Sequence, residues 1–264
     1  MQHFKYEKLG DFLEEKHILV MGVRNRWSLA RHIAEQAVWH GATIHYTYLG
    51  EKDLRNIKRL TGEPEGTFYI PCDVTSDDDI INAFSILKEK VGTIHGVVHS
   101  IAFAGADDMG GSFLDCSREG FNRALEISAY SLIPIAREAV KLMPDGGSII
   151  SLTYHGSVKV IPNYHLMGVA KAALESITRY LSYELGPSNI RVNSISAGPV
   201  KTASAQGVKD FSSILGDVAK RAPLRRNIEA VEVGKVGLFY LSDLASAVTG
   251  EITYVDSGFN IMGL

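Results

Sequence analysis

The sequence predicts an α/β protein with a Rossmann-like, doubly wound sheet of seven mainly parallel strands and helices on both faces. Short β-branched runs alternate with longer segments of helical period along nearly the whole chain. The 25 glycines are scattered at the ends of apolar runs, as short turns between strands and helices require. A strand, helix, strand order gives parallel pairing with right-handed crossovers.

The predicted elements follow one another in a regular order. The expected strands cover 17–21, 43–48, 67–70, 94–99, 148–151, 190–195 and 252–255. The expected helices cover 29–39, 77–90, 121–143, 164–185 and 231–241, with a shorter one near 54–60. In such a sheet the carboxyl ends of the strands meet at one edge, and ligands bind there.

Length and composition favour one domain over residues 1–264. A chain of 264 residues with 45% hydrophobic content can bury one large core, and no linker, repeat or long charge run interrupts it. The net charge of −3 argues against a nucleic-acid binder. No stretch of 18 uncharged apolar residues predicts a membrane span, and no apolar core near Met1 predicts a signal peptide. We therefore expect a cytoplasmic protein.

The sequence has no pattern that indicates a disulfide, a metal site or a serine hydrolase. Cys72 and Cys116 lie far apart without ligand spacing, so we expect two reduced thiols. The nine histidines have no metal-ligand spacing, and we expect no metal site. A serine hydrolase is not indicated, because no G-x-S-x-G motif is present.

The strongest functional signal is a tyrosine and a lysine, Tyr164 and Lys171, seven residues apart. At about 100° per residue their side chains return to the same helix face, roughly 10 Å apart along the axis. A phenol can hydrogen-bond a carbonyl oxygen that gains negative charge during hydride transfer, and a nearby cation favours phenolate character. The spacing alone also occurs on amphipathic helices without a site, so its place in the chain carries the interpretation.

The loop after the first strand, Gly22 to Ala30, lies where a dinucleotide pyrophosphate would meet a helix N-terminus. It is not a G-x-G-x-x-G motif, since only Gly22 remains, with Ser28 and Ala30 at the other small positions. The alternative is an ordinary turn capped by Ser28.

Two further strand ends support a cofactor site. Asp73 and Val74 follow the third strand, and the carboxylate could accept from an adenine amino group. Ser100, Ile101 and Ala102 follow the fourth strand, where small residues allow a ribose to approach. Alternatively, Asp73 caps a turn and Ser100 simply ends a strand.

Together these segments resemble a known family. Gly22 and Ser28, Asp73-Val74, Ser100 to Ala104, Ser151 to Tyr154, the Tyr164 and Lys171 pair, and Ile195 to Thr202 occur in the order of the enoyl-acyl carrier protein reductases, NADH-dependent type. These enzymes form a divergent branch of the short-chain dehydrogenase/reductase superfamily. Ordinary members carry the lysine four residues after the tyrosine, where this chain has Gly168, and a Gly-rich first loop.

The resemblance implies a role for each matching position. The implied catalytic residues are Tyr164, Lys171 and Tyr154, although Tyr154 could instead end a strand with its ring in the core. The implied cofactor-binding residues are Gly22, Ser28, Leu29, Leu49, Asp73, Val74, Ser100, Ile101, Ala102, Lys171, Ala197, Pro199, Val200 and Thr202. The implied substrate-binding residues are Ala104, Tyr154, Tyr164, Met167, Ala203 and Phe211.

Cofactor choice is indicated by the segment after the second strand. Glu51 could accept from a ribose hydroxyl, whereas Lys52 or Arg55 could pair with a 2′-phosphate. Family members that prefer NADPH tend to carry bases directly after the tyrosine, where this chain has Leu49-Gly50. We expect NADH to be preferred, with NADPH as the alternative.

The segment of about 198–226 is chemically distinct. It holds six bases against two acids, a local charge of +4 in a chain of net −3. We interpret it as a substrate-binding lid whose basic face steers an acidic acyl carrier protein. The alternative is a solvated surface helix.

The resemblance therefore implies an enoyl-acyl carrier protein reductase of type II fatty acid synthesis that transfers hydride to the β-carbon of a trans-2-enoyl thioester. It also implies a homotetramer built through helices 121–143 and 164–185. Two alternatives stay open: a reductase of another carbonyl compound such as a 3-oxoacyl thioester, and a non-catalytic NAD-binding redox sensor.

Overall fold

The computed structural model describes residues 10, 12–109, 112–200 and 211–263. Its single described sheet has seven strands in the order β3-β2-β1-β4-β5-β6-β7, and all neighbours pair in parallel. The strands are β1 (His17–Met21), β2 (Thr43–Tyr48), β3 (Tyr69–Pro71), β4 (Gly96–His99), β5 (Gly147–Thr153), β6 (Ile190–Ala197) and β7 (Ile252–Val255). The predicted Rossmann-like, doubly wound fold is confirmed.

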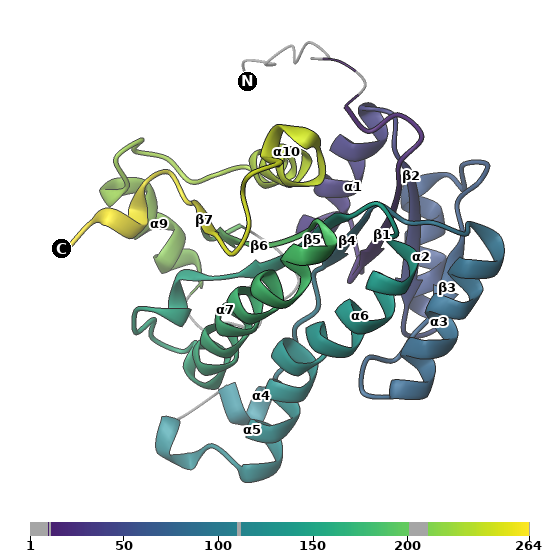
Figure 1. The fold of residues 1–264 in the computed structure, drawn as a ribbon. Coiled ribbons are helices and arrows are strands. Elements are labelled where there is room, and N and C mark those ends of the chain that lie inside the picture. Colours follow the sequence, from purple (N-terminus) through teal and green to yellow (C-terminus); the bar gives the residue numbers. More distant parts are fainter. Residues whose placement is uncertain (1–9, 11, 110–111, 201–210, 264) are drawn as a thin grey trace.

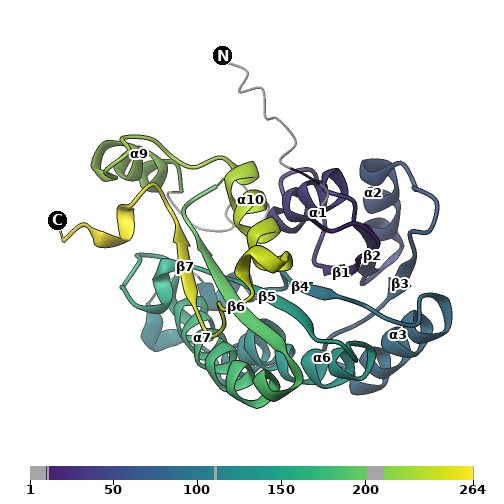
Figure 2. The same ribbon diagram turned by 45° about the horizontal axis from the view of Figure 1, so that its top comes forward.

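Helices cover both faces of the sheet (Figure 1, Figure 2). One face carries α1 (Leu29–Trp39), α2 (Glu51–Thr61) and α10 (Ala230–Leu241), and the other carries α3 (Asp77–Lys90), α6 (Leu132–Ala139) and α7 (His165–Leu185). The remaining α-helices of the described residues are α4 (Ala106–Met109), α5 (Arg118–Leu125) and α9 (Phe211–Arg221). The bounds of α1 and α3 coincide with the predicted ranges 29–39 and 77–90.

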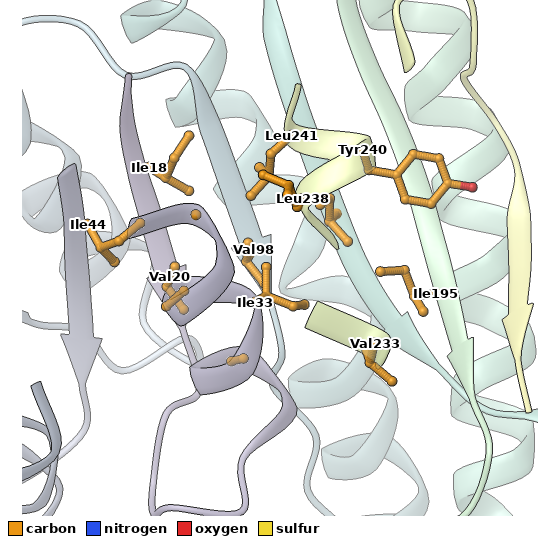
Figure 3. Packing of buried hydrophobic residues seen from close by; sticks show 14 of the residues in the cluster. Ile18, Val20, Ile33, Ile44, Val98, Ile195, Val233, Leu238, Tyr240 and Leu241 are labelled. Atoms are coloured by element: carbon orange, nitrogen blue, oxygen red, sulfur yellow. The ribbon is translucent and has the colours of Figure 1, made fainter. Parts of the chain in front are cut away.

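The core lies in two apolar layers, one on each side of the sheet. Figure 3 shows the first layer, where Ile18 and Val20 of β1 pack beneath Ile33 of α1 and Leu238 of α10. Each fully buried aliphatic side chain of this kind contributes roughly 1.5 to 3 kcal/mol relative to an exposed one. The central strands are apolar on both faces because helices cover both, as expected for a parallel sheet.

The predicted continuous helix over 121–143 is wrong in detail. α5 gives way to a π-helical turn (Glu126–Tyr130) before α6, and a 3₁₀ turn (Val140–Leu142) follows. Pro134 lacks an N–H for Tyr130, and its ring would crowd that carbonyl in a regular α-helix, so the widened turn relieves the conflict. The Ser131 N–H donates to Glu126 O at 3.0 Å, one residue further back than in an α-helix.

Smaller differences occur at strand ends. The third strand was expected over 67–70 but is Tyr69–Pro71, and proline fits there because β3 lies at the sheet edge. β5 and β6 extend beyond the expected 148–151 and 190–195, because they pair with each other along seven residues. The sequence does not predict α4, and α9 lies in the segment of about 198–226, for which a surface helix is the alternative interpretation.

No helix in the described part of the chain is long and apolar enough to cross a membrane. Both cysteines are free thiols: Cys72 is buried, and burial raises its pKa to about 12, whereas Cys116 is partly exposed.

Three histidines form a neutral hydrogen-bonded cluster at the amino end of the sheet. The Phe68 N–H donates to His45 Nδ1 at 3.3 Å, so the proton of neutral His45 sits on Nε2, which donates to His17 Nδ1 at 3.1 Å. The backbone N–H of His17 donates to His95 Nδ1 at 3.1 Å. Burial lowers the pKa of His17 and His95, and burial followed by the charge of His17 lowers the pKa of His45 to about 4.

Acid should therefore destabilise the fold through His45. Its folded-state pKa lies below the ordinary value of 6.5, so the unfolded chain binds more protons and the free energy of unfolding falls as pH drops from about 7 toward 4. Between pH 7 and pH 5 the His45 contribution is about 2 kcal/mol. His45→Gln keeps a donor and an acceptor but does not titrate, so urea denaturation should show that much less acid sensitivity.

Thr47→Ser is the matched control, because Thr47 is buried on the same strand but does not titrate, and its replacement should leave the parent's pH dependence in place. Equal acid sensitivity of His45→Gln and the parent would contradict the assignment of this role to His45.

Candidate active site

The candidate site lies at the carboxyl edge of the sheet, where β1 and β4 are neighbours. The chain leaves β1 toward α1 on one face and leaves β4 toward α5 and α6 on the other. This reversal of direction makes the crevice in which doubly wound sheets bind ligands. Gly22 follows β1 and Ser100 follows β4, so the two predicted cofactor positions flank that crevice.

Gly22 brings these two strand ends into direct backbone contact. Its φ is +90°, and a Cβ built there would stand 2.1 Å from Ser100 O. Only glycine can occupy this position without displacing either the loop after β1 or the loop after β4. The predicted proximity of Gly22 and Ser100 is therefore confirmed, and the reason is that no side chain separates them.

The Ser28 side chain does not cap α1. It folds back instead, and its Oγ accepts from the backbone N–H groups of Arg24 at 3.1 Å and Asn25 at 3.2 Å. The alternative of an ordinary turn capped by Ser28 is thus wrong. Ser28 shapes the loop and leaves the first N–H groups of α1 to other acceptors, which is what an anion at this helix end requires. Leu29, the first residue of α1, packs against the core.

At the adenine end, Asp73 takes the alternative role foreseen for it. Its Oδ1 accepts from both the N–H of Thr75 at 2.9 Å and the hydroxyl of Thr75 at 2.7 Å, which closes the turn into α3. Val74 packs partly buried beside it. A carboxylate held this way keeps Oδ2 available, so a turn cap and an adenine acceptor are compatible roles.

The remaining positions near the crevice differ in exposure. Ile101 packs against the core, whereas Ala102 and Leu49 are exposed, Leu49 by 67%. Ala104 is partly buried. Exposed apolar groups at a strand end are available to contact a bound molecule.

Tyr164 stands at the N-terminus of α7 with its ring against Tyr154, at a centroid distance of 4.8 Å and an interplanar angle of 71°. Two glycines make room for it. A Cβ on Gly156 would meet the Tyr164 ring at 2.5 Å, and one on Gly168 would meet Gly156 O at 2.7 Å. The position that holds lysine in ordinary short-chain dehydrogenases therefore has no space for a side chain here.

Burial raises the pKa of Tyr164 well above its ordinary value, and Tyr154 raises it further. The expectation of phenolate character at Tyr164 is wrong, because burial and the neighbouring Tyr154 both disfavour the charged form. Tyr164 is a neutral phenol at physiological pH, which is the form that can donate a hydrogen bond. The pKa of Tyr154 is also raised by burial.

Lys171 is buried, with 6% of its surface exposed, and Nζ donates to Leu152 O at 2.7 Å. Leu152 lies near the carboxyl end of β5, so the lysine joins α7 to the same strand that leads into Tyr154. Burial lowers the pKa of Lys171 to about 8, and the charge of Glu175 acts in the opposite direction. Tyr154 therefore contacts the Tyr164 ring and follows the strand that accepts from Lys171.

On the substrate side, Met167 lies one turn along from Tyr164 and its Sδ contacts Ser128 Oγ at 3.9 Å. Ser128 belongs to the π-helical turn and accepts from the Phe103 N–H at 3.0 Å. The irregular turn thus aims a hydroxyl at the loop after β4. Sequence periodicity could not find Ser128, because the turn departs from the helical period.

The predicted nicotinamide-binding residues lie in the loop after β6. Ala197 and Pro199 are buried, and Val200 packs partly buried against the core. A Cβ on Gly198 would stand 2.9 Å from Asp256 Cα, so this loop rests directly on the turn after β7. Thr202 and Ala203 lie outside the described residues, and Phe211 is described only as the first residue of α9.

The turn after β7, residues 256–261, also touches the proposed lid and the loop of Tyr154. The Leu224 N–H donates to Ser257 O at 3.2 Å, and Arg221 of α9 lies over the Phe259 ring at 5.8 Å. His155 packs edge-on against Phe259 at 6.2 Å. Figure 2 shows α9 and the C-terminal segment side by side. These contacts join distant parts of the chain, and no local motif signals them.

The residues present fit a dinucleotide. The Gly22 contact opens a crevice without a side chain, the start of α1 offers N–H groups, and Lys171 supplies a buried cation. Together with the Tyr164 phenol, these features define the class of short-chain dehydrogenase/reductase proteins.

Comparison with known proteins gives the family. The family profile described as Enoyl-(Acyl carrier protein) reductase matches residues 22–260, and the chain belongs to this family. The NADH-type enoyl-[acyl-carrier-protein] reductase FabI of Bacillus cereus is 50% identical over 96% of this chain and all of its own length. The NADPH-type FabI of Staphylococcus aureus is 49% identical over 94% of this chain and 98% of its own.

Solved structures agree. A Bacillus cereus enoyl-acyl carrier protein reductase with NADP+ and an indole naphthyridinone superposes with a TM-score of 0.94 at 50% identity, covering 96% of this chain and 99% of that one. The enzyme of Anaplasma phagocytophilum in complex with NAD gives a TM-score of 0.91 at 40% identity, with 97% and 95% covered.

The Gly22 contact makes a prediction. Gly22→Ala should weaken NADH binding about 5-fold to 150-fold, because the added Cβ forces Ser100 and the loop apart, and strain of this kind costs about 1 to 3 kcal/mol. NADH fluorescence titration measures the affinity. Gly186→Ala is the control, since Gly186 ends α7 in a helical conformation with nothing within 4 Å of the added Cβ. Equal affinities of Gly22→Ala and the parent would refute the close-contact role.

Proposed function

We propose that the protein is an enoyl-acyl carrier protein reductase of type II fatty acid synthesis, which saturates a trans-2-enoyl thioester with a reduced nicotinamide cofactor. The observation that carries the proposal is the neutral Tyr164 phenol held against Tyr154, two helical turns before the buried Lys171. Membership of the reductase family supports it.

The chain's residues divide the work as follows. The reduced nicotinamide, when bound, supplies the hydride that the β-carbon of the substrate accepts. Tyr164 donates a hydrogen bond to the thioester oxygen, on which negative charge collects, in a site that excludes water. Tyr154 packs against the Tyr164 ring and fixes its direction. Lys171 would hold the ribose hydroxyls, while the loop of Gly22 and Ser28 would hold the pyrophosphate.

A direct assay tests the function. NADH should lose its absorbance on addition of a crotonyl thioester and not on addition of an acetoacetyl thioester. Turnover of acetoacetyl thioester alone would identify a 3-oxoacyl reductase instead. Tight NADH binding without oxidation by either thioester would identify a redox sensor.

Two substitutions separate the proposed roles. Tyr164→Phe should lower turnover by roughly 10² to 10³, equivalent to about 3 to 4 kcal/mol of barrier, with little change in NADH affinity. Lys171→Ala should chiefly weaken NADH binding. Steady-state kinetics and NADH titration measure both, and turnover of Tyr164→Phe within threefold of the parent would remove Tyr164 from the mechanism.

We propose NADH as the preferred reductant. Arg24, which reaches from the first loop toward the ribose region, lies 3.6 Å from the Asp53 carboxylate of α2. That carboxylate offsets the charge that would otherwise attract a 2′-phosphate, and Glu51 adds a second acid to the same turn. The family contains both NADH and NADPH types, so NADPH remains the alternative to compare in the same assay.

The carrier protein would dock on the segment of about 198–226, of which residues 201–210 lie outside the described part. α9 buries Val218 and exposes Lys220 and Arg221, and the turn after it buries Ala222 and exposes Arg225. Arg226 is paired with Glu232 through two hydrogen bonds of 2.8 and 2.6 Å. The exposed bases form a positive face that suits an acidic partner.

Docking of this kind predicts a charge effect on the carrier-bound substrate. Lys220→Glu should reduce kcat/KM several-fold for an enoyl thioester on acyl carrier protein, and salt should weaken the parent's reaction strongly. The coenzyme A thioester should show neither effect. The control is Lys88→Glu, because the Lys88 side chain is exposed on α3. Equal salt dependence with both thioesters would rule out docking at this face.

We also propose a homotetramer in the cytoplasm. Tyr180 and Tyr183 of α7 are 74% and 80% exposed and Tyr130 of the π-helical turn is 47% exposed, so the helices expected at the interface present large apolar rings. Light scattering tests the stoichiometry: a mass of one chain would contradict it. Cell fractionation tests the location.

A further inference from the structure

Lys171 is a buried cation that needs compensation. Its hydrogen bond to Leu152 O supplies a dipole but no negative charge. A lysine in such a place loses its proton easily unless an acid lies nearby, because burial disfavours the charged form.

Glu175 is the acid in the right place. It follows Lys171 by one turn on α7, and only 5% of its surface is exposed. Thr153 Oγ1, at the end of β5, donates to its Oε1 at 2.6 Å. Thr153 and the Lys171 acceptor Leu152 are consecutive residues, so one strand end holds both the ammonium and the carboxylate in place.

The other titratable groups around the pair are neutral. His99 of β4 faces Lys171, and burial, then the Lys171 charge, lower its pKa to about 3. His155 and Tyr254 of β7 face Glu175; burial lowers the pKa of His155 and raises that of Tyr254. Among the described groups, Glu175 is the acid that faces Lys171.

We propose that Glu175 is a positioning residue that keeps Lys171 protonated for cofactor binding, with Thr153 holding its carboxylate at the end of β5. Glu175 forms no direct ion pair with Lys171 among the described contacts, so it acts through space and leaves the ammonium protons free for Leu152 O and a ribose. A charged donor makes a stronger hydrogen bond to a hydroxyl than a neutral amine does. The inference rests on the cofactor-binding role proposed above for Lys171.

The pH dependence of NADH affinity tests it. As pH rises through the pKa of Lys171 the ammonium is lost, so NADH binding to the parent should weaken in mildly alkaline solution. Glu175→Gln keeps the acceptor for Thr153 but removes the charge, so the midpoint of this loss should move down by about one pH unit. Near pH 6, where Lys171 is protonated in both proteins, the two affinities should agree within about twofold.

Two controls isolate the effect. Glu184→Gln removes an exposed acid from the same helix and should leave the pH profile unchanged. Lys171→Ala separates the two proposals. If Lys171→Ala binds NADH as tightly as the parent, the proposed role of Lys171 is wrong. If Lys171→Ala binds NADH more weakly but Glu175→Gln has the parent's pH profile, only the proposed role of Glu175 is wrong.

A purely structural role for Glu175 has a different signature. It would weaken NADH binding equally at every pH, without recovery near pH 6, and that result overturns the proposal. Should Glu175→Gln not fold, as judged by circular dichroism, Glu175→Asp replaces it. Aspartate places the charge one methylene further away, so the midpoint of the loss of NADH binding should move to lower pH by less than in Glu175→Gln. A pH profile identical to the parent's would again overturn the proposal.

Discussion

The arrangement of the site depends on the burial of Lys171 between α7 and the end of β5. Its bond to Leu152 O fixes the rotation of α7 against the strand, because a buried ammonium with one nearby backbone acceptor has little freedom to turn. Tyr164 is the N-cap residue of the same helix, two turns earlier, and its ring packs against Tyr154 and over Gly156. Tyr154 continues from β5 and meets Tyr164 from the other side.

The cofactor crevice depends on a second constraint, the backbone contact between Gly22 and Ser100. A positive φ and a missing side chain let the loops after β1 and β4 meet at the point where the sheet reverses direction. Ser28 then holds the loop by accepting from Arg24 and Asn25 instead of capping α1. A chain without a Gly-rich motif thus shapes the loop at the start of α1 with one glycine and one serine.

Much of this could be predicted from the sequence, because the alternation of periods two and 3.6 determines the layers of a parallel α/β fold. The positions of α1 and α3 depend on local periodicity alone. The π-helical turn depends instead on a proline conflict within a helical pattern, and Glu175 reads as an ordinary helix residue until β5 buries it. The pKa of Tyr164 was predicted in the wrong direction, since the sequence does not give the depth of burial.

The most direct test of the central claim is a crystal structure with NADH or NAD+ and a crotonyl thioester bound. The account predicts Lys171 Nζ within about 3.2 Å of a nicotinamide ribose hydroxyl, and the Tyr164 hydroxyl within about 3 Å of the thioester oxygen. A cofactor bound elsewhere, or a Tyr164 hydroxyl that still faces protein atoms while the thioester lies beyond its reach, would contradict it.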